Sequence, residues 1–514
     1  MLVKTFGSAV YGINAITITV ETYIGSGDLK YAMVGLAEGA VRESLYRIEA
    51  ALKYIDKKMP RQKLVVNLAP ADTKKEGSAY DLTIAIGILA ASGQLLCDRL
   101  GDYMIMGELS LDGGLQPIKG VLPIAIQARK ENFKGFILPK QNAREAAIVN
   151  NLDIYGVESL GEVIDLLEGT KIPEKIVVDT RATFAQSQSD IEFDFSDVKG
   201  QENIKRALEI AAAGGHNVIL IGPPGAGKTM LAKRLPTILP PLTLQEALET
   251  TKIHSVAGKM KESGTLISTR PFRAPHHTVS DVALVGGGSN PQPGEISLAH
   301  NGVLFLDELP EFKRTVLEVL RQPMEERRIN ISRSKSSVEY PANFMLVASM
   351  NPCPCGYYNH PEKECVCAPG VVQKYMNKIS GPLLDRIDLH VEVTPVPFSE
   401  LTQMQPSEKS SAIRERVIRS RQIQSDRFKT HKEIYCNAQM SNKLMREVCT
   451  ITSAGENLLK TAMEKLGLSA RAYDRILKVS RTIADLEGSA TIKTEHLAEA
   501  IQYRSLDKDS WYGL

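Results

Sequence analysis

The chain has 514 residues, of which 43% are hydrophobic and 24% are charged. This composition excludes an intrinsically disordered chain, and the length suits about three globular domains. Because 62 basic and 60 acidic side chains leave a formal charge of only +2, net charge alone indicates neither a nucleic-acid partner nor an acidic one.

The first twenty residues alternate like a strand and are interrupted by Lys4, Gly7, Gly12 and Asn14. We find no run of eighteen apolar residues, so the sequence predicts neither a signal peptide nor a membrane span. Seven cysteines, an odd number without secretory features, argue against a disulfide scaffold. We therefore expect a cytoplasmic protein with no membrane partner.

Strand-like and helix-like segments alternate over residues 1–170, which predicts one α/β domain. The expected strands are Ala15–Val20, Lys63–Leu68, Tyr103–Leu111 and Gly135–Pro139, and the expected helices are Ala37–Ile55, Ala79–Ala91 and Val121–Lys130. Residues 171–197 are expected to be a linker, because Pro173 and the polar run 186–190 interrupt both periodicities.

A phosphate-binding loop begins at Gly222, where the sequence reads GPPGAGKT between the apolar run 217–221 and a helix-forming segment. In this strand–loop–helix context, the pattern predicts that the chain binds ATP. Backbone N–H groups of the loop and the helix N-terminus both attract phosphate. We expect Lys228 to reach the β and γ phosphates and Thr229 to bind Mg²⁺. The predicted nucleotide-binding residues are Gly222, Pro223, Pro224, Gly225, Ala226, Gly227, Lys228, Thr229 and Met230.

Two acids end a later apolar strand, Gly302–Leu306, as expected of a Walker B strand. Asp307 is expected to hold Mg²⁺ through water, and Glu308 to orient or deprotonate the attacking water. This pair predicts ATP hydrolysis rather than ATP binding alone. Between the two motifs stand His276 and His277, whose side chains we expect to diverge and to serve packing or phosphate contact.

Two short strands are predicted around a Ser/Lys turn in Ile329–Tyr340. Arg333 and Lys335 stand near the tip of this hairpin, where two cations and several hydroxyls suit phosphate contact without reading bases. A solvated surface hairpin is the alternative. The Gly- and Pro-rich segment 286–294 is a second candidate loop of the same kind.

Four cysteines occupy a C-x-C, nine-residue spacer, C-x-C arrangement in a Gly/Pro-rich loop. They are Cys353, Cys355, Cys365 and Cys367. Four thiolates this close in sequence suit a closed tetrahedral Zn²⁺ site, which would stabilise a loop too polar to pack alone. An iron–sulfur cluster and unligated thiols remain alternatives. His360 lies within the spacer and can substitute for one ligand.

Three further residues follow in the chain, and their order resembles the order of the conserved ATPase residues in the AAA+ superfamily. Asn351 ends the strand Asn343–Met350, as does the sensor 1 residue of that superfamily. Arg386, in GPLLDRID, resembles the arginine finger that acts on a neighbouring subunit's ATP, and Arg471 opens a helix as the sensor 2 arginine does. A finger acting between subunits implies a homo-oligomer.

The resemblance narrows to the magnesium chelatase-like AAA+ family, and to its ComM/YifB branch. It rests on Arg270–Thr278, on Gly286–Gly294 and on Met350–Gly356. It covers essentially the whole chain. It implies a Lon-protease-like (ribosomal S5 domain 2-like) α/β domain over 1–170 and the linker 171–197. A helix-2-insert AAA+ core is implied over 198–397, including the cysteine loop 353–367. A helical lid is implied over 398–514, with an amphipathic helix at Lys409–Arg427.

The same resemblance implies the function, which composition does not. It implies a hexameric ring motor on single-stranded or branched DNA, a branch-migration helicase of the ComM type in recombination and natural transformation. The alternatives are a chelatase-type motor subunit that drives metal insertion and an ATPase that remodels or scaffolds proteins. The implied cofactors are ATP and Mg²⁺, with Zn²⁺ as a structural metal.

Because the N-terminal domain resembles that of Lon, protease activity must also be considered. Ser78 stands near the position of Lon's nucleophile, but the position of the catalytic lysine matches Leu122. Lys119 lies three residues earlier and does not fill that position. Without a general base we expect no protease. We expect Ser78 to cap the helix that follows it.

Overall fold

The computed structural model describes residues 1–28, 30–36, 39–75, 77–187, 193–261, 264–288, 291–333, 336–358, 360, 362–395, 407–431 and 433–504. The chain forms two compact units, and each of them is discontinuous in sequence. One comprises Met1–Ser187, Leu244–Ser268 and Pro291–Pro293, and the other Gln188–Thr243, Thr269–Asn290 and Gly294–Leu514. The predicted class is confirmed: the fold is mixed α/β, with a parallel sheet in the second unit and a helical C-terminal region.

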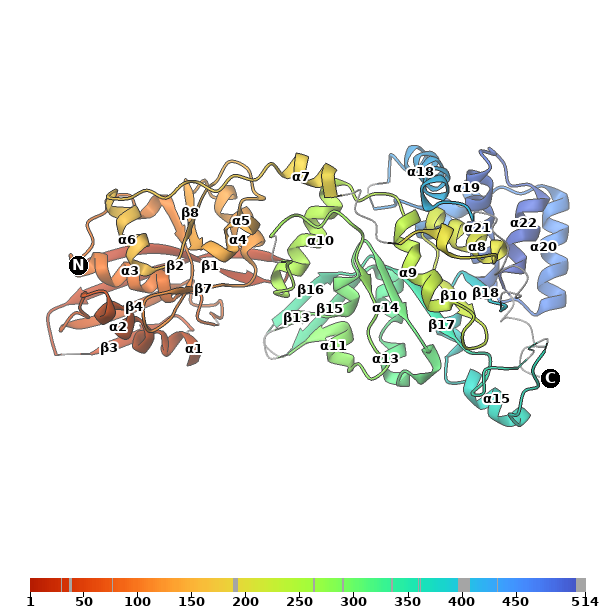
Figure 1. Ribbon diagram of the computed structural model, residues 1–514, viewed down its shortest axis with the longest axis horizontal. Helices are drawn as coiled ribbons and strands as arrows, with labels where there is room; N and C mark the ends of the chain where they lie inside the picture. The colour runs from red at the N-terminus through yellow and green to blue at the C-terminus, as the bar shows by residue number, and fades with distance from the viewer. Residues whose placement is uncertain are drawn as a thin grey trace. The chain divides into compact units, whose positions relative to one another are not determined.

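A seven-stranded sheet forms the core of the first unit, with the order β3-β4-β2-β1-β5-β8-β9 (Figure 1). Its strands are β1 (Leu2–Tyr11), β2 (Asn14–Gly25), β3 (Tyr31–Val34), β4 (Lys63–Ala69), β5 (Tyr103–Ile105), β8 (Gly135–Pro139) and β9 (Asp153–Val157). The β1–β2 hairpin and the β2–β4 pair are antiparallel, whereas β1, β5, β8 and β9 run parallel. Strands β6 (Glu108–Leu109) and β7 (Leu115–Gln116) form a separate ribbon.

Helices cover both faces of this sheet, because successive side chains of a strand point to opposite sides. The Thr5 hydroxyl of β1 donates to the Thr83 carbonyl of α3 (3.0 Å), while the ring of Phe6 packs edge-on against Phe133, just after α4. The helices of this unit are α1 (Gly39–Arg42), α2 (Ser44–Tyr54), α3 (Asp81–Ala91), α4 (Val121–Lys130), α5 (Lys140–Ala146), α6 (Leu160–Glu168), α7 (Thr180–Ser187) and α10 (Leu244–Val256), with η1 (Leu100–Asp102).

Helix α10 and the residues after it belong to this first unit although they follow the phosphate-binding loop in sequence. The N–H groups of Gly120 and Leu122 donate to the backbone oxygen (3.0 Å) and the hydroxyl (3.3 Å) of Ser255, so α10 docks at the start of α4. The segment 244–268 therefore packs outside the ATPase core that the linear prediction assigned to 198–397. Residues 171–197, predicted as a linker, contain α7 and the short helix η2 (Phe195–Asp197).

Ser78 does not cap α3, contrary to the prediction. The N-cap of α3 is Tyr80, without a side-chain hydrogen bond, and the Ser78 hydroxyl instead donates to the Glu108 carboxylate. Leu122 is fully buried in α4.

The second unit is built on a five-stranded parallel sheet with the order β11-β14-β17-β10-β18. The strands are β10 (Val218–Ile221), β11 (Phe272–Arg273), β14 (Val303–Leu306), β17 (Met345–Met350) and β18 (Leu389–Glu392). All the residues of β10, β14 and β17 are buried. A central parallel sheet brings the carboxyl ends of its strands to one edge, where α/β proteins bind ligands.

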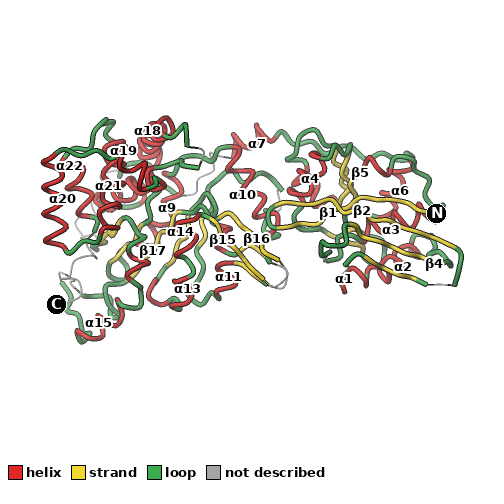
Figure 2. Tube along the Cα trace, turned by 180° about the vertical axis from the view of Figure 1, so that it is seen from behind, coloured by secondary structure: helices red, strands yellow, loops and turns green. Residues whose placement is uncertain are grey.

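The predicted hairpin is present as β15 (Arg328–Arg333) and β16 (Ser336–Pro341), paired from Arg328 with Pro341 to Arg333 with Ser336. Figure 2 shows it as two paired yellow strands. Strands β12 (Gly286–Gly287) and β13 (Gln292–Pro293) lie in the predicted Gly-rich segment, whose residues 289–290 are outside the described part of the chain.

Helices complete the second unit. Around the sheet they are α8 (Glu202–Gly214), α9 (Lys228–Ile238), α11 (Asp281–Val285), α12 (Glu295–Leu298), α13 (Arg314–Glu318), α14 (Arg321–Glu326), α15 (Pro369–Met376) and α16 (Gly381–Leu384), with η3 (Leu309–Glu311). The C-terminal helices are α18 (Ser410–Arg427), α19 (Asn442–Val448), α20 (Ser453–Leu466), α21 (Ala470–Leu486) and α22 (Thr494–Gln502), with η4 (Asn437–Gln439). These helices, blue in Figure 1, pack beside α8 and share one apolar core with the sheet. Among the described residues, no helix combines the length and apolar character that a membrane crossing requires.

Candidate functional site

The phosphate-binding loop joins β10 to α9 at the carboxyl edge of the parallel sheet. Gly222 must be glycine, because a Cβ there would lie 2.2 Å from the Val393 carbonyl oxygen. Gly225 (φ 78°) and Gly227 (φ 85°) adopt left-handed conformations, which glycine reaches without steric cost. The loop therefore turns tightly around the N-terminus of α9, where backbone N–H groups and the helix dipole attract anions.

Lys228 is buried at the first turn of α9. Its ammonium group donates to the carbonyls of Gly222 (2.7 Å) and Pro223 (2.9 Å) and to Oδ1 of Asn351 (3.1 Å). Burial lowers the pKa of Lys228, and the negative charges of Asp307 and Glu308 oppose that shift. The structure thus brings the predicted phosphate-loop lysine and the predicted sensor residue into direct contact from elements that are far apart in sequence.

Asp307 lies next to Thr229, as a shared Mg²⁺ site requires. The Thr229 hydroxyl donates to Asp307 Oδ2 at 2.8 Å, and the Ser349 hydroxyl donates to Oδ1. A hydroxyl and a carboxylate are hard oxygen donors of the kind that Mg²⁺ prefers. Thr229 and Asp307 therefore fit a magnesium ion, and Ser349, which no sequence pattern identified, holds the Asp307 carboxylate in place.

Gln201 is a second residue that no sequence pattern identified. Its side-chain amide donates to the Ala226 carbonyl in the phosphate loop (2.9 Å) and to the Thr394 carbonyl after β18 (3.2 Å). Gln201 itself is held in a left-handed conformation (φ 59°) at the N-cap of α8. In the sequence, Gly200 and the start of a helical pattern after it indicate a turn at Gln201. Neither feature indicates that Gln201 contacts the phosphate-binding loop.

Glu308 follows Asp307 in a left-handed conformation (φ 54°, ψ 50°) that is costly for a residue with a side chain. Its carboxylate lies 3.7 Å from Nδ1 of His277. The rings of His276 and His277 do not diverge as predicted, since their centroids are 4.0 Å apart with 35° between the ring planes.

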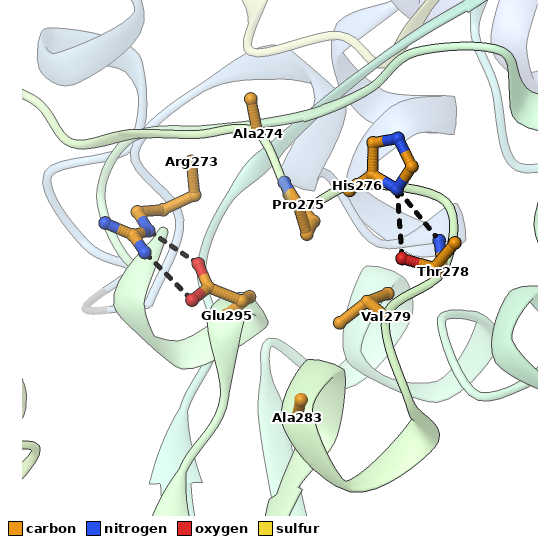
Figure 3. A pocket seen from close by; sticks show the side chains of 8 residues that line it. All are labelled: Arg273, Ala274, Pro275, His276, Thr278, Val279, Ala283 and Glu295. Carbon is orange, nitrogen blue, oxygen red and sulfur yellow. Dashed lines mark hydrogen bonds and ion pairs between the residues drawn. The ribbon is translucent and has the colours of Figure 1, made fainter.

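A pocket of about 340 Å³ adjoins the histidine pair. Figure 3 shows His276 on its wall, bonded to Thr278, and Arg273 joined to Glu295 by two short contacts of 2.6 and 2.8 Å. Because Arg273 is already paired in this way, it offers less positive charge to a ligand than its position on the pocket wall suggests.

Arg386, the predicted arginine finger, is folded back against its own chain. Its guanidinium lies 2.8 Å from Glu325 Oε1 and donates to the Pro382 carbonyl at 2.6 Å, and the residue is only 9% exposed. Arg471, the predicted sensor 2 residue, lies 3.3 Å from Asp385. In the single chain each arginine is therefore paired with a carboxylate: Arg386 with Glu325, and Arg471 with Asp385, the residue before Arg386.

The four cysteines of the predicted metal loop converge. Their sulfur atoms all lie within 4.8 Å of one another, with Sγ–Sγ distances of 3.2 Å (Cys353–Cys355), 3.6 Å (Cys353–Cys365) and 3.5 Å (Cys355–Cys365). A tetrahedron of sulfur atoms about 2.3 Å from zinc has edges of about 3.8 Å. Backbone N–H groups, first that of Tyr357, lower the pKa of Cys355 to about 6, whereas burial and the neighbouring thiols raise the pKa values of Cys365 and Cys367 against the effect of backbone hydrogen bonds. Sulfur geometry and donor chemistry therefore fit a thiolate-bound metal.

His360 does not join this cluster. Its Nδ1 accepts the N–H groups of Glu362 (3.0 Å) and Lys363 (3.1 Å), so it closes a turn of the same loop. The loop contacts the nucleotide site instead through Gly356, where a Cβ would lie 2.5 Å from Cδ of Pro224. Asn351 is two residues before Cys353, so the cysteine loop adjoins two sides of the site.

The two residues predicted to contact DNA are outside the described side chains. Arg333 pairs with Ser336 through the backbone at the end of the hairpin, and Lys335 lies outside the described residues. Their contact with DNA stays a prediction from the sequence.

Three family profiles match the chain. Residues 194–401 match a profile described as magnesium chelatase, subunit ChlI; residues 20–142 match subunit ChlI of Mg-chelatase; and residues 407–504 match the C-terminal part of subunit ChlI. The chain is 44% identical to competence protein ComM of Haemophilus influenzae over 98% of each protein. It is 44% identical to the uncharacterized protein YifB of Escherichia coli over 97% of this chain and 96% of that protein. The magnesium-chelatase 38 kDa subunit of Rhodobacter capsulatus is 29% identical over 31% of this chain and 50% of its own length.

Proposed function

We propose a function from the family of this chain, which belongs to the ComM/YifB branch of the magnesium chelatase-like AAA+ ATPases. The proposed protein is a ring motor that hydrolyses ATP to drive branch migration in DNA. The observation that carries the proposal is its likeness to ComM along the full length. In this proposal it acts in recombination and natural transformation, in the cytoplasm.

The residues at the carboxyl edge of the second sheet have the chemistry for ATP hydrolysis. Residues 222–230 wrap the phosphates, and Lys228 exchanges its loop carbonyls for phosphate oxygens. Thr229 and Asp307 hold Mg²⁺, which neutralises charge on the phosphates. Glu308 accepts a proton from the attacking water, and Asn351, already bonded to Lys228, positions that water near the γ phosphate.

A neighbouring subunit completes the site in this proposal. Arg386 stabilises the charge on the transferred phosphoryl group of the next subunit, which requires it to leave Glu325. Arg471 leaves Asp385 in the same way and contacts nucleotide in its own or the adjacent site. The assembly that such an arrangement requires is a closed homo-oligomer, and we propose a hexamer.

The decisive test measures the ATP turnover of the purified protein with branched, single-stranded and duplex DNA and without DNA. Turnover that rises with DNA, followed by displacement of a strand from a branched substrate, is the expected result. Sound basal turnover that no DNA changes contradicts the DNA motor. That result would favour one of two other functions. One is a chelatase-type motor, which the three ChlI profiles support, and the other is protein remodelling.

The hairpin β15–β16 is the proposed DNA contact, with Arg333 and Lys335 at its tip facing the pore. Replacing both by alanine should spare basal turnover and weaken stimulation by DNA. The slope of log Kd against log salt should fall by roughly one for each phosphate that the variant no longer neutralises. Arg328→Ala is the matched control, because Arg328 stands at the other end of the hairpin beside Glu339 (3.5 Å). Equal stimulation of the double variant and the wild type refutes the contact.

We assign zinc to the four-cysteine cluster as a structural metal. The purified chain should contain about one zinc ion and no iron, measured by elemental analysis. Cys365→Ser combined with Cys367→Ser should abolish the bound zinc, whereas Cys97→Ser, outside the cluster, should leave it unchanged. Because Gly356 lies so close to Pro224 that a Cβ there would come within 2.5 Å of its Cδ, loss of metal should also weaken ATP binding. Stoichiometric iron, or full metal content in the double variant, contradicts the assignment.

A further inference from the structure

His277 faces the carboxylate of Glu308 from the turn that follows the neighbouring strand β11. Nδ1 of His277 and Oε2 of Glu308 are 3.7 Å apart, and the two side chains are 32% and 58% exposed. Among the described residues, no other side chain lies within hydrogen-bond or ion-pair distance of this carboxylate. The contact therefore involves the one group that the proposed mechanism uses as a base.

The sheet places these two residues opposite each other. Strands β11 and β14 run parallel with Arg273 paired to Leu304, and His277 and Glu308 each stand four residues beyond that pair. Parallel neighbours leave the sheet at the same edge, so the turns that follow β11 and β14 bring His277 and Glu308 near each other.

The imidazole of His277 is itself held on two sides. It lies against His276 with 4.0 Å between ring centroids and 35° between the ring planes, and it meets the ring of Phe312 edge-on at 6.4 Å and 78°. Phe312 is buried, and His276 is tied to Thr278 at 3.0 Å. His277 can therefore hold a partly exposed carboxylate in place, because its own ring has little freedom.

We propose that His277 is a positioning residue for ATP hydrolysis: when nucleotide binds, Nδ1 of His277 closes the remaining distance from 3.7 Å, donates to the Glu308 carboxylate and aims that base at the attacking water. A solvent-exposed glutamate samples several rotamers, of which few reach the water, so a fixed donor raises the fraction of productive geometry. This inference rests on the proposed role of Glu308 as the base. It gives His277, which the sequence indicated only for packing or phosphate contact, a defined role beside Glu308.

The test compares the steady-state ATPase kinetics of three substitutions. His277→Leu keeps an apolar body against Phe312 but removes the donor, and should lower kcat roughly 10- to 100-fold with little change in KM. His277→Gln keeps a donor and should restore most of that loss. Glu311→Gln, which changes a nearby carboxylate paired with Lys378 and outside this contact, should retain turnover. A role in packing alone predicts the opposite order, with His277→Leu active and His277→Gln no better.

A double-mutant cycle with Glu308→Gln isolates the coupling. If His277 acts through Glu308, adding His277→Leu to Glu308→Gln should cause no further loss, whereas additive losses overturn the inference. ATP binding and thermal unfolding, measured on each variant, identify any loss of fold, and His277→Gln keeps the test valid if the leucine variant misfolds. An inactive wild type refutes the proposed ATPase mechanism, while an active wild type with normal His277 variants refutes only this inference.

Discussion

Glu308→Gln should reduce ATP turnover at least about 100-fold, because a glutamine amide cannot accept the proton of the attacking water. Binding of ATP should persist, since the groups that grip phosphate and magnesium are elsewhere: Lys228 on α9, and Thr229 beside Asp307 at 2.8 Å. Single-turnover hydrolysis and the ATP retained after rapid gel filtration measure the two effects separately. The variant should therefore accumulate in an ATP-bound state.

Glu311→Gln provides the matched control for this substitution. Glu311 is three residues further along, is partly exposed and lies 3.3 Å from Lys378, so its loss changes charge near the site without removing the base. It should turn over ATP like the wild type. Full activity of Glu308→Gln refutes its role as the base, and an equal loss in both variants indicates a general effect of charge.

Arg386→Ala should lower turnover about a thousandfold in the assembled protein, the effect expected when an arginine finger is removed. Nucleotide affinity should change little, because within its own chain the Arg386 guanidinium is bonded to Glu325 and Pro382 and leaves the phosphate loop to other residues. Steady-state turnover and ATP binding distinguish the two. Full turnover in the variant contradicts the role.

Mixing variants tests whether Arg386 acts between subunits. In a ring formed from Arg386→Ala and Glu308→Gln protomers, some interfaces join an intact Glu308 to an intact Arg386 of the neighbour. Such mixtures should regain part of the turnover that neither variant has alone. An arginine acting within its own subunit gives no recovery in any mixture.

Glu325 is the companion residue for this experiment. Its carboxylate holds Arg386 at 2.8 Å in the single chain, and the finger must exchange it for phosphate. Glu325→Gln should therefore keep turnover in the assembled protein, as should Arg321→Ala, a surface control paired with Glu318 at 2.7 Å. Loss of turnover in Glu325→Gln would show that the carboxylate also acts in the assembled site.

The sequence predicted the features whose chemistry is local in the chain. The phosphate loop and the four cysteines are each carried by fewer than about twenty consecutive residues, because a turn around an anion or a metal demands fixed types at fixed spacing. The hairpin β15–β16 and helix α4 (Val121–Lys130) also match their predicted ranges closely. The family, confirmed by comparison along the whole chain, was likewise evident from short motifs.

Long-range packing decided the rest. Helix α10 follows the ATP-binding helix in sequence yet packs in the N-terminal unit, because its Ser255 accepts hydrogen bonds from backbone groups at the start of α4, far away in the chain. The expectation that Ser78 caps a helix was wrong for the same reason, since Glu108 offers its hydroxyl a stronger, charged acceptor.

The candidate site also combines features that are local in the sequence with contacts that only long-range packing creates. Lys228, Asp307 and Asn351 were identified from sequence as separate residues, but the order β14-β17-β10 is what brings them together. Gln201, Ser349 and Glu325 have no signal of their own in the sequence, because a lone polar side chain has no pattern. His277 was noted in the sequence, but its contact with Glu308 was not. Sequence alone determined which chemistry the chain carries, and the tertiary structure decided which side chains hold that chemistry in place, since strand register and packing set those contacts.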